Sequence, residues 1–157
     1  EGLLTASLTT QPADAFVIAV PTPFKGDNHE PDLSYIESAA RALAPVLKKD
    51  DLVVLESTSP VGATERMMEV LAGVREDLSF PDTAGVESDI RIAHCPERVL
   101  PGHVIRELVE NDRIIGGVTT ACSEAAAALY GIFLEVLVVL IELSSYSRRA
   151  KLDILQF

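Results

Sequence analysis

Three short segments hold most of the side chains that could do chemistry in this sequence. They are residues 20–24 (VPTPF), 57–64 (STSPVGAT) and 95–102 (CPERVLPG). Threonine and serine hydroxyls can hold a ligand or a water molecule. Glu97 could position a water or take a proton, and the adjacent Arg98 could pair with a carboxylate or a phosphate. Taken singly, each segment could be ordinary turn sequence, and Glu97 and Arg98 could be a solvated surface pair.

The elements between these segments decide whether they can meet. Short apolar runs alternate with helical patterns, which predicts an α/β fold with a largely parallel sheet. Strand-to-helix connections of such a sheet all emerge at the edge formed by the carboxyl ends of the strands, so the three segments are expected along one border. The predicted strands are 15–20, 52–55, 90–93 and 113–115, and the predicted helices are 33–47, 63–74, 104–109 and 123–134. Residues 76–89 are expected to be a loop without order. A last apolar run covers residues 136–141.

The segment at 57–64 leads directly into a predicted helix. The first turn of a helix has unpaired N–H groups and a partial positive charge, which favour phosphate. The alternative is that Thr58 or Thr64 only caps the helix. Residue spacing leaves both interpretations open. Asp32 is a candidate cap for the preceding helix.

The two cysteines and three histidines give a weaker signal. Cys95 follows His94 on an extended segment, where the two side chains would point to opposite faces, so a buried structural thiol is favoured over a nucleophile. Cys122 at a helix start is interpreted as a packing or capping residue. The histidines have no metal-ligand spacing, and no metal site is expected.

Composition excludes several classes of function. The 157 residues are 48% hydrophobic and carry a net charge of −11, which predicts a folded domain that repels nucleic acid and anionic membranes. The run at 136–141 is far shorter than the roughly 20 residues that cross a bilayer. Two cysteines fit a reducing cytoplasm, which is the expected location.

The segments also carry a resemblance to a known family. They and their neighbours resemble the UDP-glucose/GDP-mannose dehydrogenases, and the PERVLPG form is similar to the branch that acts on UDP-N-acetyl-D-mannosamine. The matching stretches are 18–27 (IAVPTPFKGD), 30–35 (EPDLSY), 55–64 (LESTSPVGAT), 95–102 (CPERVLPG) and 111–117 (NDRIIGG). The resemblance covers about residues 1–135.

The resemblance implies a function and a role for each matched position. Members of the family oxidise the C6 hydroxyl of a nucleotide sugar to a carboxylate in two steps with NAD, and full-length members are expected to be homo-oligomers. Thr22 and Thr64 would contact NAD. Thr58, which would help to hold the catalytic water, and Glu97 would be catalytic. Arg98 and Val99 would contact the UDP-sugar.

Other parts of the family pattern do not occur in this sequence. It has no G-x-G-x-x-G fingerprint, which cradles the NAD pyrophosphate in a Rossmann fold. The resemblance therefore implies a partial Rossmann-like α/β domain, with a mostly parallel sheet whose first βαβ unit is missing. Residues 1–135 are expected to be the C-terminal part of the NAD-binding domain, and 136–157 an unmatched tail, which a change of reading frame would explain.

The family's catalytic lysine and cysteine have no match in this sequence, so the isolated chain is expected to be inactive. The alternative is a non-catalytic α/β binding or interaction module derived from the family.

Overall fold

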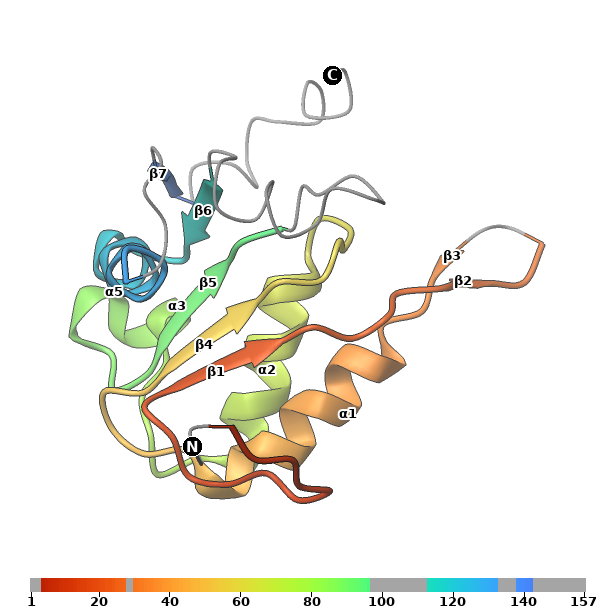
Figure 1. The fold of residues 1–157 in the computed structure, drawn as a ribbon, viewed down its shortest axis with the longest axis horizontal. Coiled ribbons are helices and arrows are strands. Elements are labelled where there is room, and N and C mark those ends of the chain that lie inside the picture. The colour runs from red at the N-terminus through yellow and green to blue at the C-terminus, as the bar shows by residue number, and fades with distance from the viewer. Residues whose placement is uncertain (1–3, 28–29, 97–112, 133–137, 143–157) are drawn as a thin grey trace.

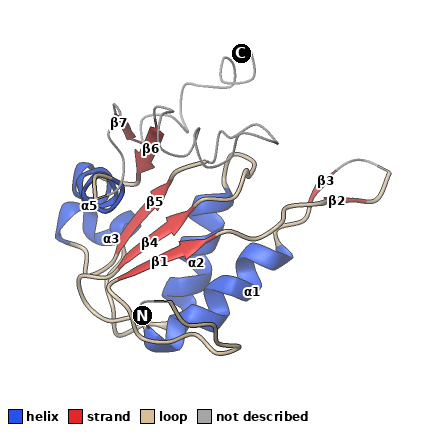
Figure 2. Ribbon diagram, viewed as in Figure 1, coloured by secondary structure: helices blue, strands red, loops and turns tan. Residues whose placement is uncertain are grey.

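The largest sheet has five strands in the order β1-β4-β5-β6-β7, with helices packed against both of its faces (Figures 1 and 2). This computed structural model describes residues 4–27, 30–96, 113–132 and 138–142. The elements are β1 (Ala15–Ile18), β2 (Phe24–Lys25), β3 (Glu30–Pro31), α1 (Ser34–Leu43), η1 (Ala44–Val46), β4 (Leu52–Leu55), α2 (Ala63–Val74), α3 (Pro81–Ala84), η2 (Gly85–Glu87), β5 (Arg91–His94), β6 (Arg113–Gly117), α5 (Thr120–Tyr130) and β7 (Val138–Glu142).

Three of the four strand pairs in this sheet are parallel. β4 pairs in parallel with β1 and with β5, and β7 pairs in parallel with β6. Only β5 and β6 run antiparallel to each other. The predicted fold class, α/β with a mostly parallel sheet, is confirmed. β7 lies within the stretch that sequence analysis set apart as an unmatched tail, and it extends this sheet at its β6 side.

The apolar residues of β4 explain its place inside the sheet, between β1 and β5. All four are buried, as expected for a parallel strand that is covered on both faces. Val53 and Leu55 belong to a core cluster with α1 and α2, whereas Leu52 and Val54 belong to a second cluster with α5. The alternation of side chains along one strand therefore builds two cores.

β1 is covered less evenly than β4. Phe16 and Ile18 are buried against α1 and α2, but Val17, on the opposite face, is 48% exposed. On that face, the described cluster under α5 reaches only the partly buried Ala15 of β1. β1 lies at one edge of the described sheet and, apart from Ala15, is packed only on the face that carries α1 and α2.

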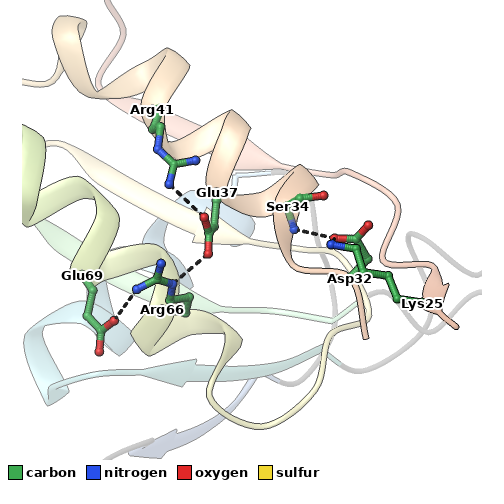
Figure 3. A network of polar contacts seen from close by, with 7 residues as sticks. All are labelled: Lys25, Asp32, Ser34, Glu37, Arg41, Arg66 and Glu69. Carbon is green, nitrogen blue, oxygen red and sulfur yellow. Dashed lines mark hydrogen bonds and ion pairs between the residues drawn. The ribbon is translucent and has the colours of Figure 1, made fainter. Parts of the chain in front are cut away.

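Polar contacts tie α1 to its neighbours (Figure 3). The Glu37 carboxylate accepts from Arg41 of the same helix and from Arg66 of α2, both at 2.8 Å. The two arginine side chains are about half exposed, and solvent screens such ion pairs, so they orient the two helices more than they stabilise the fold.

The β2–β3 hairpin projects away from the sheet, and a carboxylate holds its base (Figures 1 and 3). Asp32 forms a 2.7 Å ion pair with Lys25 and accepts the Ser34 N–H at 2.9 Å. The hydrogen bond from Lys25, together with those from Ser34, lowers the pKa of Asp32 to about 2. Asp32 therefore bonds to the N–H of the first residue of α1, but the prediction that it is the N-cap is wrong, because Leu33 holds that position.

Several element boundaries differ from those predicted. The prediction of a loop without order at 76–89 is wrong, because α3 and η2 lie there. The helix predicted at 33–47 ends as an α-helix at Leu43 and continues as η1, where Pro45 cannot donate an α-helical hydrogen bond. The strand predicted at 113–115 continues through Gly116 to Gly117 and forms β6. The helix predicted at 104–109 falls outside the described residues.

Candidate functional site

The carboxyl ends of β1, β4 and β5 lie at the same edge of the sheet, because these three strands are parallel and adjacent. A cavity of about 300 Å³ opens there, between the loops that follow β1 and β4. It is lined by Ala19, Val20, Pro21, Thr22, Glu56, Ser57 and Thr58. Two of the three segments that sequence analysis singled out therefore share one border, as predicted.

Ser57 connects the two loops. Its hydroxyl accepts the Val20 N–H at 2.7 Å and donates to the Val20 carbonyl at 2.6 Å. This side chain makes the kind of paired contact that a neighbouring strand would otherwise make. The path of the chain after β1 is therefore fixed against the path after β4.

Thr22 and Thr58 meet beside this contact. The Thr22 hydroxyl donates to the Thr58 carbonyl at 2.5 Å. Thr22 is half-buried and Thr58 is exposed, and both line the cavity. The oxygen of the Thr22 hydroxyl can still accept a hydrogen bond from a ligand.

Thr64 has a different environment. It lies in the first turn of α2, is only 4% exposed, and is not among the residues that line the cavity. The cap of α2 is Gly62, with φ 93°, and no side chain makes a capping hydrogen bond. The alternative that Thr58 or Thr64 caps this helix is therefore wrong.

The third segment is only partly described. β5 leads into Cys95 and Pro96 at the same edge of the sheet, and the Cys95 N–H bonds to the Leu55 carbonyl at 3.0 Å. Glu97, Arg98 and Val99 lie outside the described residues. Their assignments as a catalytic residue and two substrate contacts stay predictions.

His94, at the end of β5, contacts the loop that carries Thr58. Its Nε2 lies 3.3 Å from the Ser57 carbonyl and 3.5 Å from the Ser59 hydroxyl. A carbonyl only accepts, so Nε2 carries the hydrogen in this contact. Burial lowers the pKa of His94, which favours the neutral ring.

Both cysteines are fully buried. Cys95 lies in the core under α5, on the face opposite His94, and burial raises the pKa of its thiol. The Cys122 sulfur accepts from the Ile92 N–H at 3.3 Å and from the Thr119 hydroxyl at 3.2 Å. A buried thiol with a raised pKa is a poor nucleophile, which agrees with the structural role predicted for Cys95.

Glu56 is a residue of the cavity that sequence analysis did not select. Its Oε1 accepts from the Tyr130 hydroxyl of α5 at 3.2 Å and lies 3.8 Å from Nη1 of Arg113. That nitrogen is buried and makes no hydrogen bond, while the guanidinium lies 5.6 Å from the centre of the Tyr130 ring. Burial raises the pKa of Tyr130, so its hydroxyl remains a donor.

A signal for Glu56 was present in the sequence. It is the first polar residue after the buried run of β4, at the carboxyl edge where ligands of parallel sheets bind. Its partners could not be found in the same way, because Tyr130 is distant in sequence and Arg113 belongs to the antiparallel part of the sheet.

The described segments contain neither a cluster of metal ligands nor a membrane-spanning helix. No group of three or more His, Cys, Asp or Glu side chains there is arranged to hold a metal ion. No helix among these residues has the length and apolar character needed to span a membrane.

Comparison with known proteins gives the same result in sequence and in structure. The family model described as "UDP-glucose/GDP-mannose dehydrogenase family, NAD binding domain" matches residues 3–134. An NDP-N-acetyl-D-galactosaminuronic acid dehydrogenase of Ralstonia nicotianae is 71% identical over 133 residues, which are 85% of this chain and 31% of that protein. A UDP-N-acetyl-D-mannosamine dehydrogenase of Campylobacter jejuni is 67% identical over 135 residues, 86% of this chain and 33% of the relative.

A solved structure supports the assignment. The structure of a UDP-D-ManNAc dehydrogenase from Pyrococcus horikoshii superposes with a TM-score of 0.74 at 41% identity, covering 83% of this chain and 29% of that one. This chain spans about a third of the length of the relatives that it matches. The family match covers most of the sequence, so the chain belongs to the UDP-glucose/GDP-mannose dehydrogenase family, in which NAD is the cofactor of the domain that it matches.

Proposed function

We propose that this chain forms part of an NAD-dependent nucleotide-sugar 6-dehydrogenase, which oxidises the C6 hydroxyl of UDP-N-acetylmannosamine to a carboxylate in two steps. The observation that carries the proposal is the cavity at the carboxyl ends of β1 and β4, where Thr22 and Thr58 meet in a chain of this family. Thr22, one of the two residues predicted to contact NAD, lines this cavity, and so does Thr58, one of the two predicted catalytic residues.

The residues of the cavity fit one end of the dinucleotide better than the whole of it. A volume of about 300 Å³ is at the lower limit for ligand sites, which have about 300–1,000 Å³. Among the described residues, the lining offers hydroxyls, backbone groups and one carboxylate, and none of them is a lysine or an arginine. Such a lining suits a ring and ribose hydroxyls, whereas a pyrophosphate would be repelled by Glu56.

The proposed roles follow the chemistry of alcohol oxidation. NAD accepts a hydride from C6 in each step, and the hydroxyl oxygen on that carbon must lose its proton. In the second step a water supplies the additional oxygen of the carboxylate, and Thr58 would hold that water. Glu97 would assist proton transfer, Thr22 and Thr64 would contact NAD, and Arg98 and Val99 would contact the UDP-sugar.

We propose further that the isolated chain does not complete this reaction. Its sequence has no G-x-G-x-x-G fingerprint to hold a pyrophosphate, and the family's catalytic lysine and cysteine have no match in it. Residues 1–135 would be the C-terminal part of the NAD-binding domain, and 136–157 a tail that lies outside the family match. Full-length members would be cytoplasmic homo-oligomers that bind neither nucleic acid nor membranes.

A hybrid enzyme tests the proposal. The segment of this chain that matches the Campylobacter jejuni dehydrogenase replaces the corresponding segment of that protein, from which it differs at about a third of its positions. NADH formation is followed at 340 nm with UDP-N-acetylmannosamine and, separately, with UDP-N-acetylgalactosamine, since the names of the relatives differ in the sugar. The proposal predicts NADH with the first sugar, at two NADH per sugar consumed.

Threonine variants complete the design. Thr58→Ala should lower kcat by about 100-fold, the cost of misplacing a reacting group by about 1 Å. The control is Thr83→Ala, which removes an exposed threonine hydroxyl within α3, outside the cavity. A folded hybrid that makes no NADH with either sugar would exclude the proposal. It would favour the alternative of a non-catalytic α/β binding or interaction module.

A further inference from the structure

The backbone ladder between β1 and β4 ends before it reaches the cavity. Its last parallel pair is Ile18 with Leu55, and two further backbone bonds reach the Ile18 carbonyl, from the Glu56 N–H at 2.9 Å and from the Ser57 N–H at 3.4 Å. Pro21 has no N–H, so the ladder cannot continue through it. Some other contact must therefore set the spacing between the loop of Thr22 and the loop of Thr58.

The Ser57 side chain supplies that contact. One hydroxyl bonds to both backbone groups of Val20, the N–H at 2.7 Å and the carbonyl at 2.6 Å. Val20 lies two residues before Thr22, and Ser57 directly precedes Thr58. The direct bond from Thr22 to the Thr58 carbonyl is the next contact outward along the same two loops.

His94 and Ser59 hold Ser57 from the other side. The Ser57 carbonyl lies 3.3 Å from His94 Nε2 and accepts from the Ser59 hydroxyl at 3.1 Å. Ser57 is thus bonded through its side chain to the loop after β1 and through its carbonyl to the end of β5. The ends of three adjacent strands are linked through this single residue.

From this geometry we infer that Ser57 is a positioning residue, which sets the distance between Thr22 and Thr58 and so aligns the cofactor side of the cavity with its catalytic side, with His94 as its support. Ser57 is not a catalytic residue in this inference. The inference gives a reason why a serine, and not an alanine of similar size, occupies a half-buried position between two loops. Its catalytic consequence rests on the proposed function, but its structural part does not.

Amide hydrogen exchange, measured by NMR on the intact chain, tests the structural part. Ser57→Ala should speed exchange of the Val20 amide by about tenfold or more, because losing a bond of about 1.4 kcal/mol changes an opening equilibrium tenfold. The Leu52 amide, bonded to the Asp14 carbonyl at 3.0 Å, serves as a reference within the same strand pair and should change less. Ser57→Thr keeps the hydroxyl and should restore protection of Val20.

A second serine provides a matched control. Ser79 is also half-buried, and its hydroxyl also makes two bonds, donating to the Asp89 carboxylate at 2.7 Å and accepting the Asp89 N–H at 2.9 Å. These contacts are far from the cavity, beside the amino end of β5. Ser79→Ala should therefore reduce overall stability to a similar extent and leave the exchange of Val20, relative to Leu52, unchanged.

Kinetics of the hybrid enzyme test the catalytic consequence. Ser57→Ala should lower kcat by about tenfold and change KM for the sugar by less than about twofold, because an alignment defect acts on the transition state more than on substrate binding. Ser57→Thr should recover most of the kcat, and Ser79→Ala should keep it.

The inference is overturned if Val20 stays protected in Ser57→Ala, or if Ser79→Ala exposes Val20 to the same extent. It is also overturned if the hybrid carrying Ser57→Ala keeps its full kcat. A hybrid that is inactive with the wild-type segment would count against the proposed function alone, and the exchange experiment would still decide the role of Ser57.

Discussion

Replacement of Gly117 by alanine is expected to destabilise this chain more than most single methyl additions. Gly117 ends β6, where α5 begins its approach to the sheet, and its N–H donates to the Ser123 hydroxyl at 3.0 Å. A Cβ at this position would lie 2.3 Å from the Ser123 nitrogen and 2.6 Å from the Thr119 carbonyl oxygen. Both are backbone atoms at the start of a packed helix, so neither can move without displacing α5.

The magnitude follows from two contributions. Overpacking of a well-packed site costs about 1–3 kcal/mol. Displacement of α5 would also weaken the bond from Gly117 to Ser123, which is worth about 0.5–1.5 kcal/mol. We expect the free energy of unfolding to fall by about 2–4 kcal/mol, and the melting temperature by roughly 5–15 °C for a chain of this size. Circular dichroism during heating, with urea unfolding at 25 °C, measures both.

Gly73 provides a control with the opposite sign. It lies within α2, is exposed, and a Cβ there would have no neighbour within 4 Å. Gly73→Ala should stabilise the chain by about 0.5–1 kcal/mol, since alanine has the higher helix propensity. If Gly117→Ala unfolds at the same urea concentration as the wild type, or if both variants lose stability equally, the argument from close approach is refuted.

Three further predictions concern pH, thiol reactivity and the cofactor. The Ser79 hydroxyl and N–H, together with Lys49, hold the pKa of Asp89 at about 2, below its ordinary 3.8. The stabilisation from this carboxylate is fully present above the pKa of the unfolded state and is lost as the pH falls toward 2, so the urea midpoint should drop across that interval. Asp89→Asn should make the urea midpoint depend less steeply on pH, and an unchanged dependence would argue against this role of Asp89. Cys95 and Cys122 should resist a thiol reagent at pH 8 until urea is added, and one rapid equivalent from the folded chain would show that burial has been misjudged. Calorimetric titration should find NAD binding no tighter than millimolar, and a micromolar dissociation constant would contradict the inferred lack of a pyrophosphate cradle.

The sequence was sufficient where one physical signal dominated. The strand Leu52–Leu55 and the helix Ala63–Val74 have the predicted boundaries. The strand is a continuous apolar run bounded by polar residues, and the helix follows a proline and a glycine. The shared border of Thr22 and Thr58 was also predictable, because parallel strands place their connections at one edge.

The sequence alone did not predict the positions whose roles depend on a partner distant in the chain or on close packing against another element. The strand predicted at 113–115 continues to Gly117, where the close approach of the start of α5 leaves room only for glycine. Ser57 looked like one of several loop serines, and its role depends on Val20, which is 37 residues away. Propensity describes single residues, whereas these positions are determined by partners.

The position of each loop in the sheet determines how firmly it is held. The loop of Thr58 follows the interior strand β4 and has support on both sides, from Val20 through Ser57 and from His94 of β5. The loop of Thr22 follows β1, the edge strand of the described sheet, whose Val17 is half exposed. Local opening is easiest where few buried contacts hold a segment. The isolated chain should therefore keep the geometry of the Thr58 loop longer than that of the Thr22 loop, so that local opening of the cavity would begin at its cofactor side.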